Sequence, residues 1–313
     1  MNFRCFAKEA PRDSCPWFSS QILEAESAPS IQCCARRNQP DPSAELQDPR
    51  VLAVSPFSSV RCLHRVARDL DSYNRGTMQL RVDDALFERF PDLAIGVVIA
   101  VGIDNHRQGE AAAAFLRERV DAIRSSWSPD RLEADSRIAA WREAYRSFGA
   151  KPKKHRCSVE NMIRSILEGE GLHPINAAVA TYNAISLKHG VPAGGDDLDR
   201  VVGDIVLTFA EGDERFVPLN GTEPMPPKPG EVIYRDDEDV LCRRWNWREC
   251  DKSKMTADSR NLCLVVEGLP PVSREDVRQV STELCDDIAT FCGGSTDVQL
   301  VDRDAPEVRI RKL

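Results

Sequence analysis

The stretch Leu241-Cys-Arg-Arg-Trp-Asn-Trp-Arg-Glu249 holds two of the five tryptophans of the chain, together with arginines, an asparagine and a carboxylate. If it is a β-strand, its side chains alternate between two faces. Trp245 and Trp247 then share one face, and Arg244, Asn246 and Arg248 share the other. Two indoles are large enough to anchor the strand against a core, and the opposite face suits phosphate, carboxylate or ribose. The alternative is an edge strand whose polar face only meets water.

The composition is typical of a globular protein. The chain has 313 residues, of which 42% are hydrophobic, and a formal net charge of -8. An acidic chain does not hold a polyanion by bulk electrostatics, so any nucleic acid must meet a local basic patch. No apolar run is long enough to cross a bilayer, and the first residues lack the apolar region of a secretion signal. We therefore expect a cytoplasmic protein without a membrane partner.

The cysteines do not predict a metal site or a disulfide framework. There are 11 of them, but no two have the Cys-x-x-Cys spacing. Reduced thiols in the cytoplasm explain them better, and we expect no metal and no cofactor.

Residues 1–77 differ from the rest of the chain. They are rich in Ser, Pro, Arg and Asp and show no amphipathic pattern. We expect this segment to be disordered, or to be upstream sequence translated before a biological start at Met78. Residues 78–313 are then expected to form one domain.

From Met78 the pattern predicts helices first and strands afterwards. Helices are expected at 108–126, 129–148, 158–167, 176–189 and 273–291, with Ser158 as an N-cap. Strands are expected at 94–102, 204–210, 215–219, 231–234, 240–247, 262–266, 297–301 and 308–312, the last two at sheet edges. This order predicts an α+β fold in a single domain.

Five motifs along this order resemble a known family. They are Phe148-Gly-Ala-Lys-Pro-Lys-Lys-His-Arg-Cys-Ser158, the helix end Tyr182-Asn-Ala-Ile-Ser-Leu-Lys-His-Gly-Val-Pro192, the turn Gly194-Gly-Asp-Asp-Leu-Asp199, Gly203-Asp-Ile205 and Cys242-Arg-Arg-Trp-Asn-Trp-Arg-Glu249. Over residues 78–313 the chain resembles a free-standing B3/B4 domain, the editing domain in the β subunit of bacterial phenylalanyl-tRNA synthetase. The resemblance implies N-terminal helices packed on mixed β-sheets. It also implies a tRNA-related role at the acceptor end, such as hydrolysis of a mischarged aminoacyl-tRNA in trans, without a metal or a covalent nucleophile.

The chain departs from the synthetase pattern at two turns. Gly194 stands where the synthetase has a histidine in its Gly-x-Pro-x-His-Ala-Phe-Asp turn, and Asn246-Trp-Arg-Glu249 replaces a Gly-Gly-Glu turn. The amino-acid specificity of the synthetase is therefore not carried over. A non-catalytic module that binds tRNA or an amino acid is the alternative function, and a hydrolase or carrier for another amino compound is a third.

The run from Lys151 to Arg156 is the most basic stretch of the domain. Pro152 predicts a loop, and phosphate is the natural partner of such a run. The candidate binding residues are Lys151, Lys153, Lys154, His155 and Arg156. The alternative is a charged connecting loop that binds nothing.

The 241–249 stretch supplies the candidate chemistry. The resemblance implies that Arg244, Asn246 and Arg248 hold the terminal adenosine and polarise the ester carbonyl, because fixed donors stabilise developing negative charge. Glu249, with Asn246, is the candidate catalytic residue, either binding the substrate ammonium or orienting the attacking water. The alternative for Glu249 is an exposed carboxylate paired with Arg243 or Lys252.

Three weaker candidates remain. His155 and Cys157 have the spacing of two metal ligands or of a thiol nucleophile and its base, but no third group accompanies them. Asp196, Asp197 and Asp199 follow Gly194 and Gly195 and could approach a ligand through the bare glycine backbone, but a solvated turn is the more frequent meaning of such a cluster. Asn176 and Asn183 lie seven apart on one helix face, where they either face a pocket or serve as cap and solvated surface. The sequence carries no signal for an oligomeric state.

Overall fold

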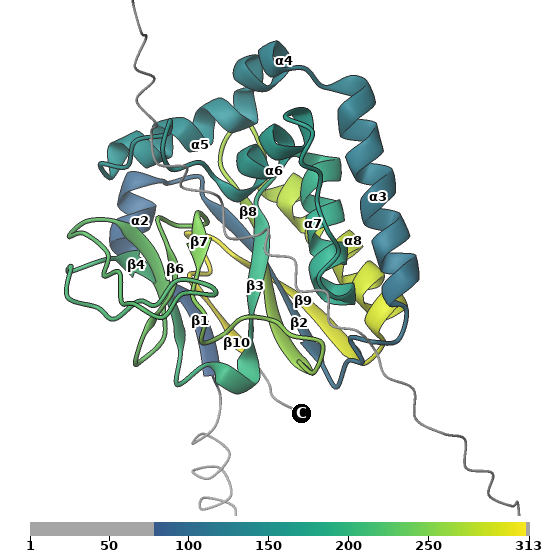
Figure 1. Cartoon of the computed structure of the whole chain (residues 1–313). Helices are drawn as coiled ribbons and strands as arrows, with labels where there is room; N and C mark the ends of the chain where they lie inside the picture. Colours follow the sequence, from purple (N-terminus) through teal and green to yellow (C-terminus); the bar gives the residue numbers. More distant parts are fainter. Residues whose placement is uncertain (1–77, 311–313) are drawn as a thin grey trace, which may run out of the picture. The chain divides into compact units, whose positions relative to one another are not determined.

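The computed structural model describes residues 78–310, and Figure 1 shows their arrangement. The expected disorder of residues 1–77 and the expected start at Met78 concern a segment outside the described residues. Within 78–310 no helix is long and apolar enough to span a membrane.

The elements form an α+β fold, as predicted, in which a run of helices from α3 to α7 precedes a run of strands from β3 to β8. The helices are α2 (Asp84–Arg89), α3 (Gly109–Ser126), α4 (Pro129–Ala134), α5 (Ser136–Ser147), α6 (Ser158–Leu167), α7 (Ala177–His189) and α8 (Arg274–Cys292). The strands are β1 (Met78–Val82), β2 (Ala94–Val101), β3 (Ala193–Asp197), β4 (Ile205–Phe209), β5 (Val232–Arg235), β6 (Val240–Arg243), β7 (Arg248–Glu249), β8 (Asn261–Gly268), β9 (Ser295–Val301) and β10 (Glu307–Ile310).

The strands form two sheets. One has six strands in the order β10-β1-β4-β5-β6-β7, in which only β1 and β4 pair in parallel, and the other has four antiparallel strands in the order β3-β8-β2-β9. The sheets meet between their buried faces, where the hydroxyl of Tyr234 on β5 donates to Oε1 of Glu267 on β8 at 2.7 Å. One edge of each sheet, β7 and β3, carries candidate site residues.

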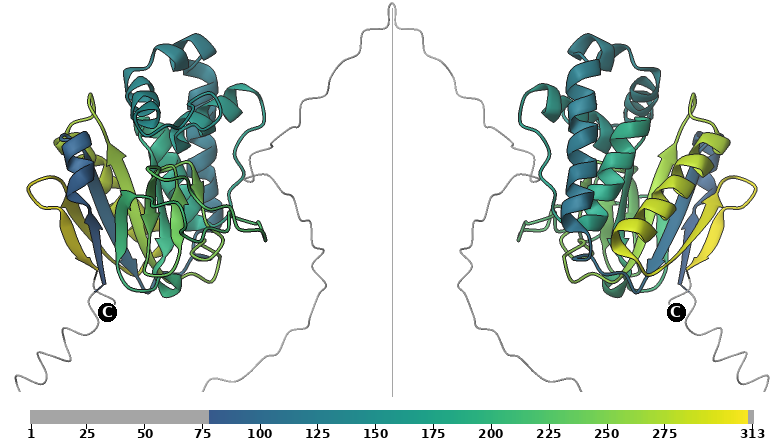
Figure 2. Two further views of the ribbon diagram at one scale, coloured as in Figure 1. Left: turned by 90° about the vertical axis from the view of Figure 1, so that its left-hand side faces the viewer. Right: turned by 90° about the vertical axis from the view of Figure 1, so that its right-hand side faces the viewer.

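Helices cover the other face of the four-stranded sheet. Figure 2 shows α8 along this sheet with α7 and α3 stacked beyond it. Two glycines permit the close approach of α8, because a Cβ at Gly96 would stand 1.7 Å from Oγ of Ser281 and a Cβ at Gly268 would stand 2.3 Å from Val277. The apolar run of β2 is confirmed as a buried central strand.

The structure corrects four sequence-based expectations. Residues 129–148 are two helices, because Asp135 ends α4 and its side chain caps α5. Ser158 is the first residue of α6 and Cys157 is its N-cap. Residues 215–219 form no strand and make only an isolated bridge from Pro218 to Cys250. The expected turn at Gly194-Gly195 lies in strand β3.

The stretch 241–249 is a β-hairpin and not one strand. Strand β6 ends at Arg243 and β7 begins at Arg248, with a turn between them. Arg244 and Trp245 have φ values of 48° and 66°, a left-handed conformation that costs a non-glycine residue of order 1–3 kcal/mol. The expected alternation is therefore wrong, and the two tryptophans point to different surroundings.

Candidate functional site

Trp245 pins the hairpin turn to the core. Its side chain is fully buried, and its ring meets Trp141 edge-on at 5.0 Å and Phe90 at 4.9 Å between centroids. Its Nε1 donates a hydrogen bond of 2.7 Å to Glu267 Oε1. These contacts hold the strained turn, because buried aromatic area and a satisfied indole N–H offset the cost of two left-handed residues.

Asn246 belongs to the same buried network. Its Nδ2 donates to Glu267 Oε2 at 2.7 Å, and its Oδ1 accepts from the hydroxyl of Tyr145 at 2.9 Å. Asn246 is therefore rigidly oriented, and its carbonyl oxygen and one amide hydrogen are already engaged. Glu267 was absent from the sequence-based candidates because a single glutamate in an apolar strand carries no local signal.

Trp247 lies on the outer side of the turn and is only partly buried. The guanidinium of Arg244 stands 4.4 Å from its ring centroid and that of Arg248 stands 4.6 Å away. His155 from the basic loop meets the same ring edge-on, with centroids 4.6 Å apart. Trp247 thus joins the two arginines of the hairpin to the loop. We name Arg244, Trp247, Arg248 and the loop 151–156 the cationic face.

A buried carboxylate fixes part of this face. Glu231 accepts from Arg243 at 3.0 Å and pairs with Nη2 of Arg244 at 2.9 Å. Both arginine side chains are at least nine-tenths buried. Since Glu231 already compensates it, the charge of Arg244 is held in place and is less available to a ligand than that of an exposed residue.

The basic loop is a loop, as Pro152 predicts. Lys151, Lys153 and Lys154 are exposed, whereas Arg156 lies 3.8 Å from the buried Glu160. Exposed lysines beside a tryptophan that carries two arginines suit a chain of phosphates.

His155 is neutral at physiological pH. Burial, followed by the charges of Arg244, Arg243, Lys154 and Arg248, lowers its pKa to about 4. Its Nδ1 is buried and has no hydrogen-bond partner within residues 78–310. The imidazole therefore adds a ring and an acceptor to the cationic face, and not a charge.

Glu249 lies where the edges of the two sheets meet. A Cβ built at Gly194 on β3 would stand 3.3 Å from Glu249 Oε1, so only a glycine leaves this carboxyl open on that side. The expected partners of Glu249 are engaged elsewhere, because Arg243 pairs with Glu231, and Lys252 pairs with acidic residues of the 236–239 turn. Burial and the charge of Asp196 raise the pKa of Glu249 to about 8.

Two further residues surround Glu249 that sequence reasoning did not select. Cys242 pairs directly with Glu249 across the hairpin, so both side chains lie on one face. Tyr182 on α7 is 2% exposed. Burial, then the charges of Glu249, Asp196 and Cys242, raises the pKa of its hydroxyl well above the usual value. Cys242 opens the 242–249 motif and Tyr182 lies on a helix, but no local signal marks either of them as a site residue, since they come from separate elements.

Asn176, Asn183 and Gly195, the remaining candidates, lie in the framework of α7 and β3. Asn176 is the N-cap of α7, with Oδ1 accepting from Val179 N at 3.0 Å and Nδ2 donating to Met255 O at 3.2 Å. Asn183 lies inside α7 and is 9% exposed. Gly195 lies against the backbone of β8, where a Cβ would stand 2.2 Å from Cys263 O.

The aspartates after the glycines are not a solvated turn. Asp196 accepts from Ser253 at 2.5 Å, Asp197 accepts from Ser259 at 2.5 Å, and Asp199 accepts from Asn261 at 2.8 Å. These hydrogen bonds attach the 250–261 segment to β3 and the turn after it, next to Glu249.

The described residues do not assemble a metal centre or a thiol nucleophile at His155 and Cys157. No three His, Cys, Asp or Glu side chains within 78–310 are grouped to hold a metal ion. Cys157 is buried, and burial with the charge of Glu160 raises the pKa of its thiol far above the usual value. A thiol of this kind is not a nucleophile.

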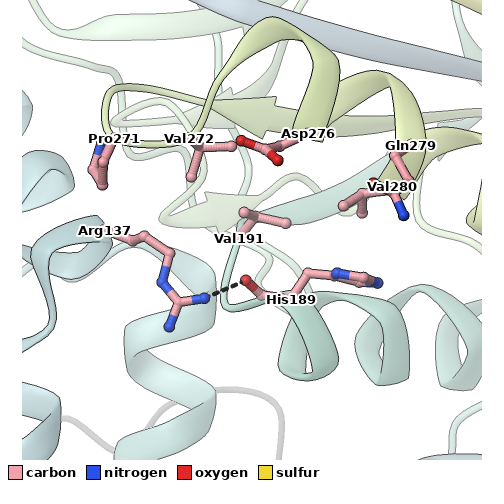
Figure 3. A pocket seen from close by; sticks show the side chains of 8 residues that line it. All are labelled: Arg137, His189, Val191, Pro271, Val272, Asp276, Gln279 and Val280. Atoms are coloured by element: carbon pink, nitrogen blue, oxygen red, sulfur yellow. Dashed lines mark hydrogen bonds between the residues drawn. The ribbon is translucent and has the colours of Figure 1, made fainter.

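A surface pocket of about 300 Å³ lies elsewhere, between α5, the end of α7 and the start of α8. Figure 3 shows Arg137 directed at the backbone oxygen of His189, which it reaches at 2.6 Å, with Val191 and Val272 forming apolar walls. None of the sequence-based candidates lines this pocket, so it is separate from the site around Glu249.

Comparison with known proteins gives three findings. A family model described as the B3/4 domain matches residues 140–293. The phenylalanine–tRNA ligase beta subunit of Fusobacterium nucleatum subsp. nucleatum is 26% identical over 122 residues, which are 39% of this chain and only 15% of that subunit. An N-terminal fragment of the phenylalanyl-tRNA synthetase beta-subunit from Pyrococcus horikoshii, known from a crystal structure, has a TM-score of 0.36 and 15% sequence identity, over 74% of this chain and 54% of that one.

Proposed function

Since residues 140–293 of this chain form a B3/4 domain, related to a segment of phenylalanyl-tRNA synthetase beta subunits, we propose that the protein binds the aminoacylated acceptor end of a tRNA in the cytoplasm and hydrolyses its ester bond. The similarity to a tRNA synthetase subunit supports tRNA as the partner. The residues around Glu249 support the ester as the reacting group.

One observation carries the proposal. The hairpin 240–249 presents Trp247 with its two arginines to the basic loop and, two residues later, presents Glu249 to Gly194 on the neighbouring sheet. The arginines of the cationic face and the carboxyl of Glu249 therefore lie on one short hairpin, which supports a site for a phosphate chain next to a site for a small polar group. A terminal nucleotide that carries an amino acid has the same two parts, a polyanionic chain and a small amino compound joined by an ester.

Each part of the site has a role in this proposal. Lys151, Lys153, Lys154 and Arg248 hold phosphates, and the ring of Trp247 offers a stacking surface to a base. Asn246 directs its remaining amide hydrogen toward the ester carbonyl. Glu249 lies at the aminoacyl end, where it binds the ammonium group or orients the water.

The proposed reaction needs no covalent intermediate. The oxygen of a water molecule bonds to the carbonyl carbon, the bond from that carbon to the ribose oxygen breaks, and a proton from the water passes to the ribose oxygen. The products are a free amino acid and an uncharged tRNA.

The test is a deacylation assay with purified protein and a panel of correctly and incorrectly charged tRNAs. We expect at least one aminoacyl-tRNA to be hydrolysed well above its spontaneous rate, and Glu249→Gln to abolish the excess. The variant Arg303→Ala, in the exposed turn between β9 and β10, serves as the control. A panel without any accelerated hydrolysis would overturn the enzymatic proposal.

A second function, binding without turnover, is favoured by a separate observation. Asn246 and Arg244 are both engaged with buried carboxylates, Glu267 and Glu231, so few donors remain for a developing oxyanion. This function predicts saturable binding of tRNA that Lys153→Ala weakens, with no excess hydrolysis of any charged tRNA.

A further inference from the structure

Two acidic side chains share one side of the seam between the sheets. Gly194 and Asp196 are two residues apart on β3, so they face the same way, toward the six-stranded sheet. Glu249 Oε1 stands where a side chain at Gly194 would begin. Asp196 and Glu249 therefore line one region, with Cys242 beside Glu249 through their cross-strand pairing.

This region lacks a compensating positive charge from the described chain. Within residues 78–310 the carboxyl of Glu249 makes no hydrogen bond and no ion pair, and Asp196 is bonded to Ser253 alone. Burial, then the charge of Asp196, raises the pKa of Glu249, and burial raises the pKa of Asp196 to about 6. Two carboxyls held near each other in this way are stabilised by any cation that enters.

An independent observation points to a ligand. Tyr182 is 2% exposed, yet no residue within 78–310 hydrogen-bonds its hydroxyl. Buried tyrosine hydroxyls usually have a partner. Helix α7, which carries Tyr182, packs on β3, which carries Gly194 and Asp196. Burial, then the charges of Glu249 and Asp196, raises the pKa of the Tyr182 hydroxyl, so this hydroxyl faces the same region as the two acids.

We propose that Glu249, Asp196 and Tyr182 form a binding site for a primary ammonium group. An ammonium carries three hydrogen-bond donors, which match two carboxylates and one phenolic oxygen. A divalent metal is a poorer fit, since no third acidic, thiol or imidazole ligand of the described residues joins the pair. Gly194 leaves the carboxyl of Glu249 accessible, so it admits the ligand.

The source of the ammonium rests on the proposed function. An aminoacyl ester offers its α-ammonium, and a basic amino acid also offers a side-chain ammonium. Both have the chemistry that the site recognises, and two probes separate them. Leucinamide carries only the α-ammonium, Nα-acetyl-lysinamide carries only the side-chain ammonium, and Nα-acetyl-norleucinamide is a neutral counterpart of the latter.

The test is isothermal titration calorimetry of the full chain with each probe at about pH 7.5, where an α-amino group with a pKa near 8 is largely an ammonium, and without RNA. We expect one ammonium probe to bind at least tenfold more tightly than the neutral probe. Glu249→Gln and Asp196→Asn should each weaken that binding tenfold or more, and Gly194→Ala should weaken it by obstructing access. Glu223→Gln, which removes an exposed carboxylate from another loop, should leave it unchanged.

Three results would overturn the proposal: no binding of either ammonium probe up to 10 mM to folded protein, equal binding of the neutral probe, or full affinity retained in Glu249→Gln. Circular dichroism of each variant confirms folding. The outcome is independent of the deacylation assay. Amine binding without hydrolysis would support the ammonium site and rule out the enzymatic function. Hydrolysis without amine binding would support the enzymatic function and rule out the ammonium site.

Discussion

Trp245 Nε1 donates a hydrogen bond of 2.7 Å to Glu267 Oε1, and this bond joins the hairpin turn to the opposite sheet. The same carboxyl also accepts from Tyr234 and Asn246. One buried glutamate on β8 thereby sets the orientation of the turn that presents the cationic face and Glu249. The left-handed residues Arg244 and Trp245 lie directly at this attachment, and the buried bond helps to offset their conformational cost.

Replacement of Trp245 by Phe should destabilise the protein by about 1–3 kcal/mol. A phenyl ring keeps part of the aromatic packing, but it is smaller than the buried indole, and Glu267 Oε1 loses the N–H donor. Trp247→Phe is the matched control, and because Trp247 is only partly buried we expect a change below about 1 kcal/mol. Urea denaturation followed by circular dichroism measures both. Equal midpoints for the two variants would contradict the assigned role of the Trp245 bond.

Glu267 makes the stability depend on pH. Burial outweighs its three hydrogen bonds and raises its pKa to about 7. A carboxyl group whose pKa is higher in the folded state than in the unfolded state stabilises the fold while it is protonated. Its contribution is complete below the pKa of the unfolded state and is lost as the pH rises through the pKa of the folded state. The free energy of unfolding should therefore fall by about 3 kcal/mol between pH 4.5 and 7.5 on account of this residue.

Glu267→Gln tests this pH dependence. The neutral amide can retain its bonds to Trp245 and Tyr234, and a flipped Asn246 side chain can accept from the new amide group. We expect the variant to fold and to lose the part of the pH dependence that Glu267 supplies. The measurement is urea denaturation of both proteins at half-unit intervals from pH 4.5 to 7.5. Parallel curves for variant and wild type would show that Glu267 does not titrate in this range.

Much of the fold was predictable, because its signals are local. The apolar run of β2 and the capping residue Ser273 of α8 mark their elements without reference to the rest of the chain. The turn at 244–247 was not predictable, since neither Arg244 nor Trp245 favours a left-handed backbone and only the distant Glu267 explains it. The glycines of β3 predict a turn, because glycine favours turns. In the structure Gly195 instead permits close packing on the backbone of β8.

The site was predictable in part for the same reason. The basic loop and Glu249 stand out by their charge. The hairpin places Trp247 against the basic loop and carries Glu249 two residues further along. Tyr182 and Cys242 carry no such signal, because their relevance depends on the meeting of α7, β6 and β7 in space.

Gly195→Ala should destabilise the protein much more than Gly194→Ala. At Gly195 a Cβ would stand 2.2 Å from Cys263 O and 2.8 Å from Leu264 Cα, both backbone atoms that cannot move independently. We expect a loss of about 1–3 kcal/mol there. At Gly194 the one contact with a described residue is Glu249 Oε1 at 3.3 Å, the end of a side chain, so stability should change by less than about 0.5 kcal/mol. Thermal unfolding of the two variants makes the comparison, and a Gly194→Ala variant as unstable as Gly195→Ala would mean that β3 is packed on both sides.

Lys153→Ala and Lys154→Ala should weaken tRNA binding mainly at low salt. Both lysines are exposed and have no ion pair within the described residues, so they are available to phosphates. Each phosphate contact contributes roughly 0.7–0.9 to the slope of log K against log salt concentration, so each substitution should reduce that slope by about this amount. Arg303→Ala removes an exposed charge from the turn between β9 and β10, which belong to the sheet edges remote from β7 and β3, and should leave the slope unchanged. Filter binding of labelled tRNA between 50 and 300 mM salt, as rough bounds for this regime, measures it. Slopes equal to that of the wild type in both lysine variants would remove the loop from the tRNA-binding face and leave the hairpin arginines as its only candidates.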